Sequence, residues 1–191
     1  MTLWADADSL PREVKDLIGR RASSSSGDFP IRAVFVANRS MPLPPGKNLY
    51  AVIVGPAGAS AKPPAEASKP PAEASKPPSV TSASPAAKAC DNADDYIMDS
   101  ASPGDVLVTR DLPLAARAVE KGLVAINDRG TLWTAGALRE RVSLRDHMAT
   151  LRELGVAPPS PKGRGFGPKD VKAFADALDK AIRTASIAQR T

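Results

Sequence analysis

Three kinds of residue are scarce in this 191-residue sequence: cysteine, histidine and the aromatic residues. The single cysteine, Cys90, excludes a disulfide within the chain and fits a reducing compartment. The single histidine, His147, falls inside a long predicted helix, so we interpret it as a surface or packing residue. Phe, Trp and Tyr make up only 4% of the residues, which argues against a broad platform for stacking the bases of a single strand.

Long apolar runs are also missing. No stretch of about 18 apolar residues occurs, so no segment is expected to span a membrane. The N-terminal region contains Asp6 and Asp8 and has no basic segment followed by a long apolar one, so no signal peptide is expected. These absences predict a cytoplasmic protein that has no membrane partner.

The apolar residues that are present, 42% of the chain, suffice for one domain with a core of mostly Val, Leu, Ile and Ala. The net charge of +5 is unevenly distributed, because residues 110–191 hold 15 Lys and Arg against 9 Asp and Glu, a net charge of +6. A basic half beside an acidic cluster suits a polyanionic substrate that is held near metal ions. A well-solvated basic surface explains the same asymmetry.

A low-complexity segment interrupts the chain at residues 56–90. Its heptad Lys-Pro-Pro-Ala-Glu-Ala-Ser begins at Lys62, recurs at Lys69 and decays after Lys76. The segment holds 8 of the 19 prolines, and Val80 is its only large aliphatic residue, so it buries too little apolar surface to offset the entropy of ordering it. We predict a disordered Pro/Ala/Ser-rich insert within a single domain at 1–191. It is either a tolerated surface insertion or a site for a proline-binding partner.

Outside this insert, predicted strands alternate with predicted helices. Short runs of aliphatic and β-branched residues predict strands at 3–5, 31–36, 49–54, 106–108 and 123–126. Apolar residues at helical spacing predict helices at 11–21, 92–100, 112–121, 134–154 and 168–188. Strands separated by helices imply an α/β fold, in which helices cover both faces of a mostly parallel sheet.

Six aspartates occur where predicted strands end or where a predicted helix begins. They are Asp6 and Asp8 after the first strand, Asp111 and Asp128 after the fourth and fifth strands, and Asp94 and Asp95 in the first turn of the helix at 92–100. Ligand sites of parallel sheets lie outside the carboxyl ends of the strands, so these side chains are expected to share one edge. Carboxylates that lie close together raise their pKa values or bind a cation, and hard oxygen ligands select Mg²⁺ or Mn²⁺.

Helix capping is an alternative explanation for several of these aspartates. The candidate caps are Asp8 or Ser9 for the first helix, Asp91 or Asn92 for the second, and Asp111 for the third, which Pro113 helps to start. Asp128 would then belong to a plain turn. Capping does not explain why two aspartates follow the first strand, and at this point both interpretations stay open.

Several short motifs follow one another along the chain. They are Trp-Ala-Asp-Ala-Asp at 4–8, Val-Ala-Asn-Arg at 36–39, Asp-Asn-Ala-Asp-Asp-Tyr-Ile at 91–97, Asp-Val-Leu-Val-Thr-Arg-Asp-Leu-Pro-Leu-Ala at 105–115, Asn-Asp-Arg-Gly at 127–130, Arg-Val-Ser-Leu-Arg-Asp at 141–146 and Phe-Ala-Asp-Ala-Leu-Asp at 174–179. With these motifs the sequence resembles the YaiI/YqxD family of bacterial proteins over nearly the whole chain apart from 56–90. That family usually begins with Asp-x-Asp-x-Cys-Pro, whereas Leu10 stands at the cysteine position here, which excludes a thiol role for it.

The family is grouped with PIN-like domains, so the resemblance implies a three-layer PIN-like domain with a mostly parallel central sheet flanked by helices. PIN-like nucleases carry an acidic residue after the first strand, another on a central helix, and an aspartate in a Thr-x-Asp pattern. Asp6, Asp94 or Asp95, and Asp111 match those places. The implied activity is phosphodiester hydrolysis, in which Mg²⁺ or Mn²⁺ activates water and neutralises charge on the cleaved phosphate. The predicted catalytic residues are Asp6, Asp94 and Asp111, and the predicted metal ligands are these three with Asp8, Asp95 and Asp128.

Basic and amide side chains complete the predicted site. Asn38 and Arg39 end a strand, and Arg141 and Arg145 lie four residues apart on one helical face. Arg145 shares a stripe with apolar residues, so it is expected to be partly buried and paired. These side chains would either contact the phosphates of a substrate or form structural ion pairs with the aspartates.

The favoured hypothesis is therefore a metal-dependent nuclease, with RNA preferred to DNA by analogy to the fold. One alternative is a non-catalytic protein that binds metal and nucleic acid on the same scaffold. The other is a hydrolase of small phosphorylated molecules. An extended basic surface beside the aspartates would favour a polymer, and a narrow closed pocket would favour a small substrate. The sequence leaves the oligomeric state open.

Overall fold

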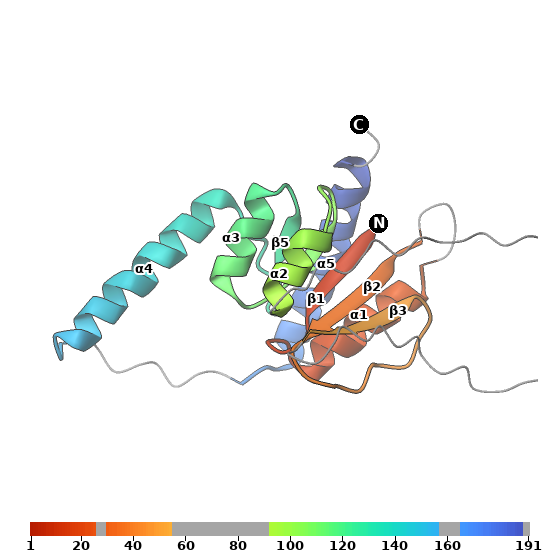
Figure 1. Ribbon diagram of the computed structural model, residues 1–191, viewed down its shortest axis with the longest axis horizontal. Coiled ribbons are helices and arrows are strands. Elements are labelled where there is room, and N and C mark those ends of the chain that lie inside the picture. Colours follow the sequence, from red (N-terminus) through yellow and green to blue (C-terminus); the bar gives the residue numbers. More distant parts are fainter. Residues whose placement is uncertain (26–29, 55–91, 157–164, 189–191) are drawn as a thin grey trace, which may run out of the picture.

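A computed structural model describes residues 1–25, 30–54, 92–156 and 165–188 (Figure 1). The predicted insert at 56–90, with Cys90, lies outside the described residues, so the prediction of disorder stays a prediction. Across the described ranges, no helix is long and apolar enough to cross a membrane. The cytoplasmic location likewise stays a prediction.

Five parallel strands form the single described sheet, in the order β3-β2-β1-β4-β5. The strands are β1 (Thr2–Asp6), β2 (Arg32–Ala37), β3 (Leu49–Ile53), β4 (Val106–Val108) and β5 (Val124–Ile126). β1 lies at the centre, where Leu3 is in register with Ala33 of β2 and with Val106 of β4. β1, β2 and β4 are short aliphatic runs buried on both faces, which is typical of parallel sheets, whereas β3 at one edge of the sheet is partly exposed. The prediction of an α/β fold with a mostly parallel sheet is confirmed.

Helices cover both faces of this sheet and make three layers (Figure 1). They are α1 (Arg12–Ser23), α2 (Ala93–Ser100), α3 (Leu112–Glu120), α4 (Ala135–Glu153) and α5 (Pro168–Ala188). The chain crosses the sheet in opposite directions in its two halves, from β1 to β3 and then from β4 to β5. Because crossovers between parallel strands are right-handed, α1 and α3 fall on opposite faces.

Two hydrophobic cores lie on the two sides of the sheet. Along β1, Leu3 belongs to the core formed with α1 and α5, whereas Trp4 belongs to the core formed with α2 and α3. Phe174 of α5 and Ile97 of α2 are fully buried in these two cores. Burying one such side chain stabilises the fold by roughly 1.5–3 kcal/mol. Both sheet faces are therefore closed by side chains, and only the strand ends remain for polar chemistry.

The helix starts decide between several of the predicted caps. Asn92 caps α2 by accepting from the Asp95 amide at 2.8 Å, and Asp111 caps α3 by accepting from the Leu114 amide at 2.9 Å. The prediction that Asp8 or Ser9 caps α1 is wrong, because α1 begins after Pro11 without a side-chain cap. Both of those side chains bond elsewhere, at the loops that follow β1 and β2.

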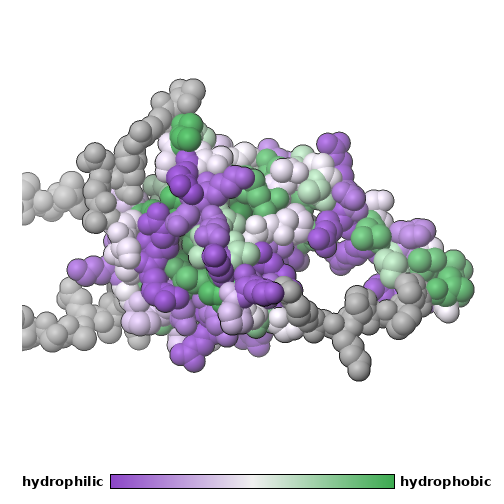
Figure 2. Space-filling model, turned by 180° about the vertical axis from the view of Figure 1, so that it is seen from behind, coloured by the Kyte–Doolittle hydropathy of each residue, from purple (hydrophilic) through white to green (hydrophobic). Residues whose placement is uncertain are grey.

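α4 projects from the body of the protein and packs mainly against α3 (Figure 1). Leu138, in its first turn, is its only buried residue. Leu144 in the helix and Leu154 and Val156 just beyond it are among the exposed large apolar residues, and apolar side chains appear at the tip of this projection in Figure 2. The prediction of a long helix here is confirmed, but most of it faces solvent.

Candidate functional site

The site lies at the point where the strand order reverses. On one side β1 pairs with β2, from which the chain continues outward to β3. On its other side β1 pairs with β4, from which the chain continues outward in the opposite direction to β5. The crevice outside the carboxyl ends of two such strands is where parallel α/β sheets bind ligands. Asp6 is the last residue of β1, and Thr109 follows the last residue of β4, so both flank this crevice.

A buried hydroxyl links the two sides of the crevice. Thr109, which is fully buried, donates from Oγ1 to Oδ2 of Asp6 at 2.8 Å. Oγ1 of Thr109 in turn accepts from the backbone amide of Asp111 at 2.9 Å. Thr109 therefore places Asp6 and Asp111 near each other although they are more than one hundred residues apart. Asp111 uses Oδ1 to cap α3, as the capping interpretation predicted. Its other oxygen, Oδ2, has no partner among the described residues.

Asp94 brings a third carboxylate to this place from the first turn of α2. The side-chain oxygen of Asn38, after β2, accepts from the Ala93 amide at 3.1 Å and so attaches the start of α2 to the sheet edge. Burial raises the pKa of Asp94, and the charges of Asp6 and Asp111 raise it further, while Arg117 opposes the shift. Asp6, Asp94 and Asp111 are here called the inner trio, in which Asp94 is close enough to the other two to be repelled by them.

The other three predicted ligands each contact an arginine. Oδ1 of Asp8 lies 3.5 Å from Nε of Arg39, Oδ1 of Asp95 lies 2.8 Å from Nη2 of Arg117, and Oδ2 of Asp128 lies 3.5 Å from Nε of Arg110. Asp8 also accepts from the Asn38 amide through Oδ2 at 2.6 Å. Asp8, Asp95 and Asp128 are called the outer aspartates. They share the sheet edge with the inner trio, as predicted, but each is already in contact with a positive charge.

The inner trio matches a hard divalent cation in its chemistry. All its donors are carboxylate oxygens, and Asp6 and Asp111 each keep one oxygen without a partner among the described residues. As the side chains stand, no three Asp, Glu, His or Cys residues of the described part of the chain converge closely enough to hold a metal ion. The donor set fits Mg²⁺ or Mn²⁺, and the side chains of the trio would have to turn toward one another around the ion.

The predicted phosphate-binding residues fall into two groups. Asn38 and Arg39 lie at the same edge as the aspartates, and the side-chain oxygen of Asn38 already accepts a hydrogen bond from the first residue of α2. Arg141 and Arg145 are exposed on α4, and neither pairs with an acidic residue of the described chain. The expectation that Arg145 is partly buried and paired is wrong, because α4 leaves the body after its first turn.

Sequence reasoning missed three residues of this edge: Thr109, Arg110 and Arg117. Thr109 and Arg110 stand inside the Thr-x-Asp pattern, so that motif was a usable signal for both. Arg117 had no such signal, because its partner Asp95 is on another helix, 22 residues away. Asp105 was also passed over; it is buried and accepts from Thr2, Trp4 and Ser102, which makes it a structural residue.

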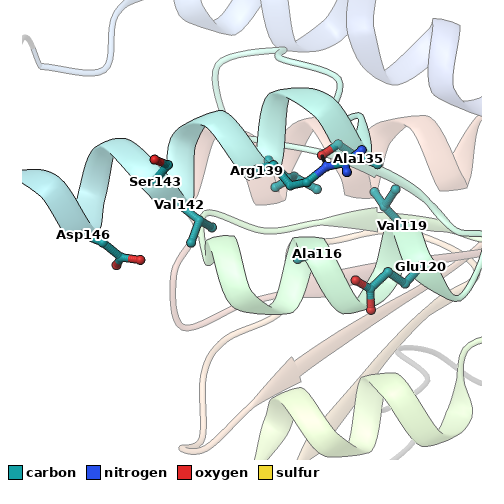
Figure 3. Close-up of a pocket in the computed structure, with 9 residues that line it drawn as sticks. Ala116, Val119, Glu120, Ala135, Arg139, Val142, Ser143 and Asp146 are labelled. Atoms are coloured by element: carbon teal, nitrogen blue, oxygen red, sulfur yellow. Dashed lines mark hydrogen bonds between the residues drawn. The ribbon is translucent and has the colours of Figure 1, made fainter.

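A separate groove lies between α3 and α4 (Figure 3). Its lining includes Val119 and Leu138 with the charged residues Glu120, Arg139 and Asp146. In Figure 3 Val142 points from α4 toward α3, and Asp146 and Glu120 lie at opposite ends of the groove. None of the inner trio or the outer aspartates lines this groove, so the groove is separate from the aspartate site.

These features define a class: an all-parallel α/β protein with a carboxylate site at the reversal of its strand order. Residues 71–184 match the profile described as "Uncharacterized BCR, YaiI/YqxD family", which covers more than half of the chain. The chain belongs to the YaiI/YqxD family, as its motifs indicated.

Relatives confirm this membership along nearly the whole chain. A UPF0178 protein of Syntrophobacter fumaroxidans is 35% identical over 184 residues, which cover 95% of this chain and 94% of the relative. A UPF0178 protein of Bordetella parapertussis is 34% identical over 183 residues, covering 96% and 91%. The UPF0178 protein YaiI of Escherichia coli is 33% identical over 180 residues, covering 94% and 92%. No solved structure matches the chain.

Proposed function

We propose that this protein is a Mg²⁺- or Mn²⁺-dependent nuclease that hydrolyses phosphodiester bonds, with RNA favoured over DNA. The observation that carries the proposal is that Asp6 ends β1 while Asp94 and Asp111 belong to the starts of α2 and α3, at the reversal of the strand order. Three chain segments supply these carboxylates, and burial together with the charges of Asp6 and Asp111 raises the pKa of Asp94. Repelling carboxylates at a ligand-binding crevice indicate a cation site.

The inner trio would hold the ion, which when bound activates water and neutralises charge on the phosphate. The chain's own residues do the rest. Thr109 holds Asp6 by donating to Oδ2, so the other oxygen of Asp6 keeps one orientation. Asn38 holds the start of α2 and with it Asp94. Such positioning matters because catalytic groups lose most of their effect when misplaced by about 1 Å.

The three layers with an all-parallel sheet and the family membership support a PIN-like assignment within the proposal. In that assignment Asp6 occupies the place after the first strand, Asp94 the central helix, and Asp111 the Thr-x-Asp place.

One observation favours a second candidate, a non-catalytic protein that binds metal and nucleic acid at the same edge. The described carboxylates do not converge on one point, so an ion held by fewer protein ligands would serve recognition more readily than hydrolysis. In this candidate the same aspartates bind the cation, and no phosphodiester bond is broken.

The two candidates separate in one experiment. Calorimetric titration with Mn²⁺ on the full chain and on Asp6→Asn and Asp111→Asn is followed by incubation with a mixed RNA pool. Asp179→Asn is the matched control, because Asp179 pairs with Arg21 on the helix layer of α1 and α5. Binding and cleavage lost in both site variants, and kept in the control, support the nuclease. Binding without cleavage supports the second candidate, and no Mn²⁺ binding by the intact chain refutes both.

A further inference from the structure

Three arginines each contact one of the outer aspartates. They are Arg39 with Asp8, Arg110 with Asp128, and Arg117 with Asp95, and they are here called the edge arginines. Arg39 follows β2, Arg110 follows β4, and Arg117 belongs to α3. Arg39 and Arg110 come directly after strands that end at the crevice, and Arg117 reaches from the last turn of α3 to Asp95 in the first turn of α2.

The edge arginines hold their guanidinium groups toward solvent. The side chains of Arg39, Arg110 and Arg117 are 84%, 56% and 48% exposed. For Arg39 and Arg110 the carboxylate partner is much less exposed, at 24% for Asp8 and 9% for Asp128. The aspartate thus lies on the inner side of each of these pairs and the cationic group on the outer side.

These contacts leave most of the arginine donors unused. A guanidinium has five N–H donors in a planar fork that matches a phosphate with two parallel bonds. Arg39 and Arg110 approach their carboxylates with Nε at 3.5 Å, a distance and geometry that make an ionic contact and no hydrogen bond. The terminal nitrogens of Arg39 have no hydrogen-bond partner among the described residues, and Arg110 uses Nη1 for a long contact of 3.4 Å to the carbonyl of Ser9.

The positive charges are near the inner trio as well as exposed. Arg117 pairs with Asp95, the chain neighbour of Asp94, at 2.8 Å. Arg110 is adjacent to Asp111 in the chain, and its backbone amide donates to Ser9 Oγ in the loop after β1. Arg39 follows Asn38, which contacts both Asp8 and the start of α2. A strand whose scissile phosphate lay at the trio would have its neighbouring phosphates beside these arginines.

A purely stabilising role explains the Arg39 and Arg110 pairs poorly, whereas Arg117 donates a hydrogen bond to Asp95 at 2.8 Å. Exposed ion pairs contribute little to folding, and long contacts without hydrogen bonds contribute least. Arg21 and Asp179 form a tighter exposed pair, at 2.6 Å, between α1 and α5. Arg21 is in the last turn of α1, which runs back from the carboxyl edge to lead into the parallel strand β2, so this pair lies at the opposite edge. It is the natural reference for an arginine–aspartate pair without a ligand role.

We propose that Arg39, Arg110 and Arg117 bind three phosphates of one RNA strand, and that the outer aspartates position these arginines. This inference rests on the proposed function and deepens it, because it makes the substrate a polynucleotide strand that passes over the inner trio. Asp8, Asp95 and Asp128 then serve as partners of arginine and not as ligands of the ion.

The salt dependence of RNA binding measures the number of phosphate contacts directly. Each neutralised phosphate of a single strand contributes about −0.7 to the slope of log K against log salt concentration. Three contacts correspond to a slope of about −2.1, or about an 18-fold loss of affinity between 50 and 200 mM salt. Removing one contact lowers this loss to about 7-fold.

The experiment titrates the full chain with a fluorescent single-stranded RNA, with a chelator present so that no metal-dependent cleavage occurs. The variants are Arg39→Gln, Arg110→Gln and Arg117→Gln, and Arg21→Gln is the matched control. We expect each edge variant to reduce the slope by about 0.7 and the control to leave it unchanged. Lysine at each position should restore the slope, since it keeps the charge, and this rescue also shows that a Gln variant has not failed through misfolding. Equal slopes for all four Gln variants would overturn the proposal.

A second measurement tests the role of the outer aspartates. Asp8→Asn should leave Mn²⁺ binding unchanged and weaken RNA binding, because Arg39 loses its charged partner. Loss of Mn²⁺ binding with unchanged RNA binding would make Asp8 a metal ligand and overturn its assigned role.

Failure of this inference is distinguishable from failure of the proposed function. If the slopes change as expected but the wild-type chain cleaves no RNA with Mn²⁺, the arginine contacts stand and the nuclease proposal falls. If the chain cleaves RNA and no edge substitution changes the slope, the nuclease proposal stands and the arginine contacts fall.

Discussion

Asp111 combines two roles that two substitutions can separate. Its Oδ1 caps α3 by accepting from the Leu114 amide at 2.9 Å, and its charge contributes to the inner trio. Asparagine can accept the same capping bond without the charge, whereas alanine removes both. The comparison of Asp111→Asn with Asp111→Ala therefore isolates the charge from the cap.

The expected stability changes follow from these contacts. Replacing an N-cap by alanine costs about 1 kcal/mol, within a range of about 0.5–2 kcal/mol, because a backbone donor of the first turn loses its acceptor. For a chain of this length, about 1 kcal/mol lowers the Tm by about 2–4 °C. Asp111→Asn also loses the favourable interaction of a carboxylate with the helix start, about 0.3–1 kcal/mol, but it relieves the repulsion with Asp94. We therefore expect its free energy of unfolding to stay within about 0.5 kcal/mol of the wild-type value.

Urea denaturation at pH 7 with a chelator measures the stabilities, and calorimetry measures Mn²⁺ binding. We expect Asp111→Ala to be clearly less stable than Asp111→Asn, and both variants to lose Mn²⁺ binding. If the two variants lost equal stability, the capping bond would contribute nothing. If Asp111→Asn bound Mn²⁺ as tightly as the wild type, Asp111 would be a helix cap only.

Three further predictions test individual contacts of the fold. Because the pKa of Asp94 is raised above its ordinary value of 3.8 in the folded protein, the charged form is penalised there. Asp94→Asn should therefore raise the free energy of unfolding at pH 7. This gain should shrink as the pH falls through the folded pKa of Asp94 and vanish below 3.8, where the carboxyl is protonated in both states. Urea titrations at pH 7 and pH 3 measure the difference. Thr109→Val should lower the free energy of unfolding by about 1–3 kcal/mol in the same assay, because the Asp6 carboxylate loses a buried donor and the Asp111 amide loses its acceptor. Thr109→Ser keeps the hydroxyl and should keep most of the stability. Gly130→Ala should cost more than about 1 kcal/mol, because Gly130 has φ +80° and an added Cβ would clash with the Ala173 carbonyl oxygen. Gly136→Ala, in α4 with open space around it, should be neutral or stabilising, and thermal denaturation measures both variants.

Much of the fold was predictable because the signals are local. Each strand is a short aliphatic run and each helix has an apolar stripe, and burial of these patterns requires a sheet covered on both faces. The position of the site was predictable for the same reason, since aspartates after parallel strands must meet at one edge. The first helix cap was not, because Asp8 had a competing partner in the Asn38 amide, across a strand pair that local pattern does not reveal.

By itself, the sequence determined the strands, the helices and the carboxylates at the strand ends, because periodicity and residue type act over a few neighbouring positions. Only the tertiary structure decided that β1 lies beside β4, and therefore that Thr109 joins Asp6 to Asp111 across more than one hundred residues. It alone decided that Arg117 reaches Asp95 and that most of α4 leaves the core. These outcomes depend on strand order and on crossovers between distant segments, which no local pattern of residues specifies.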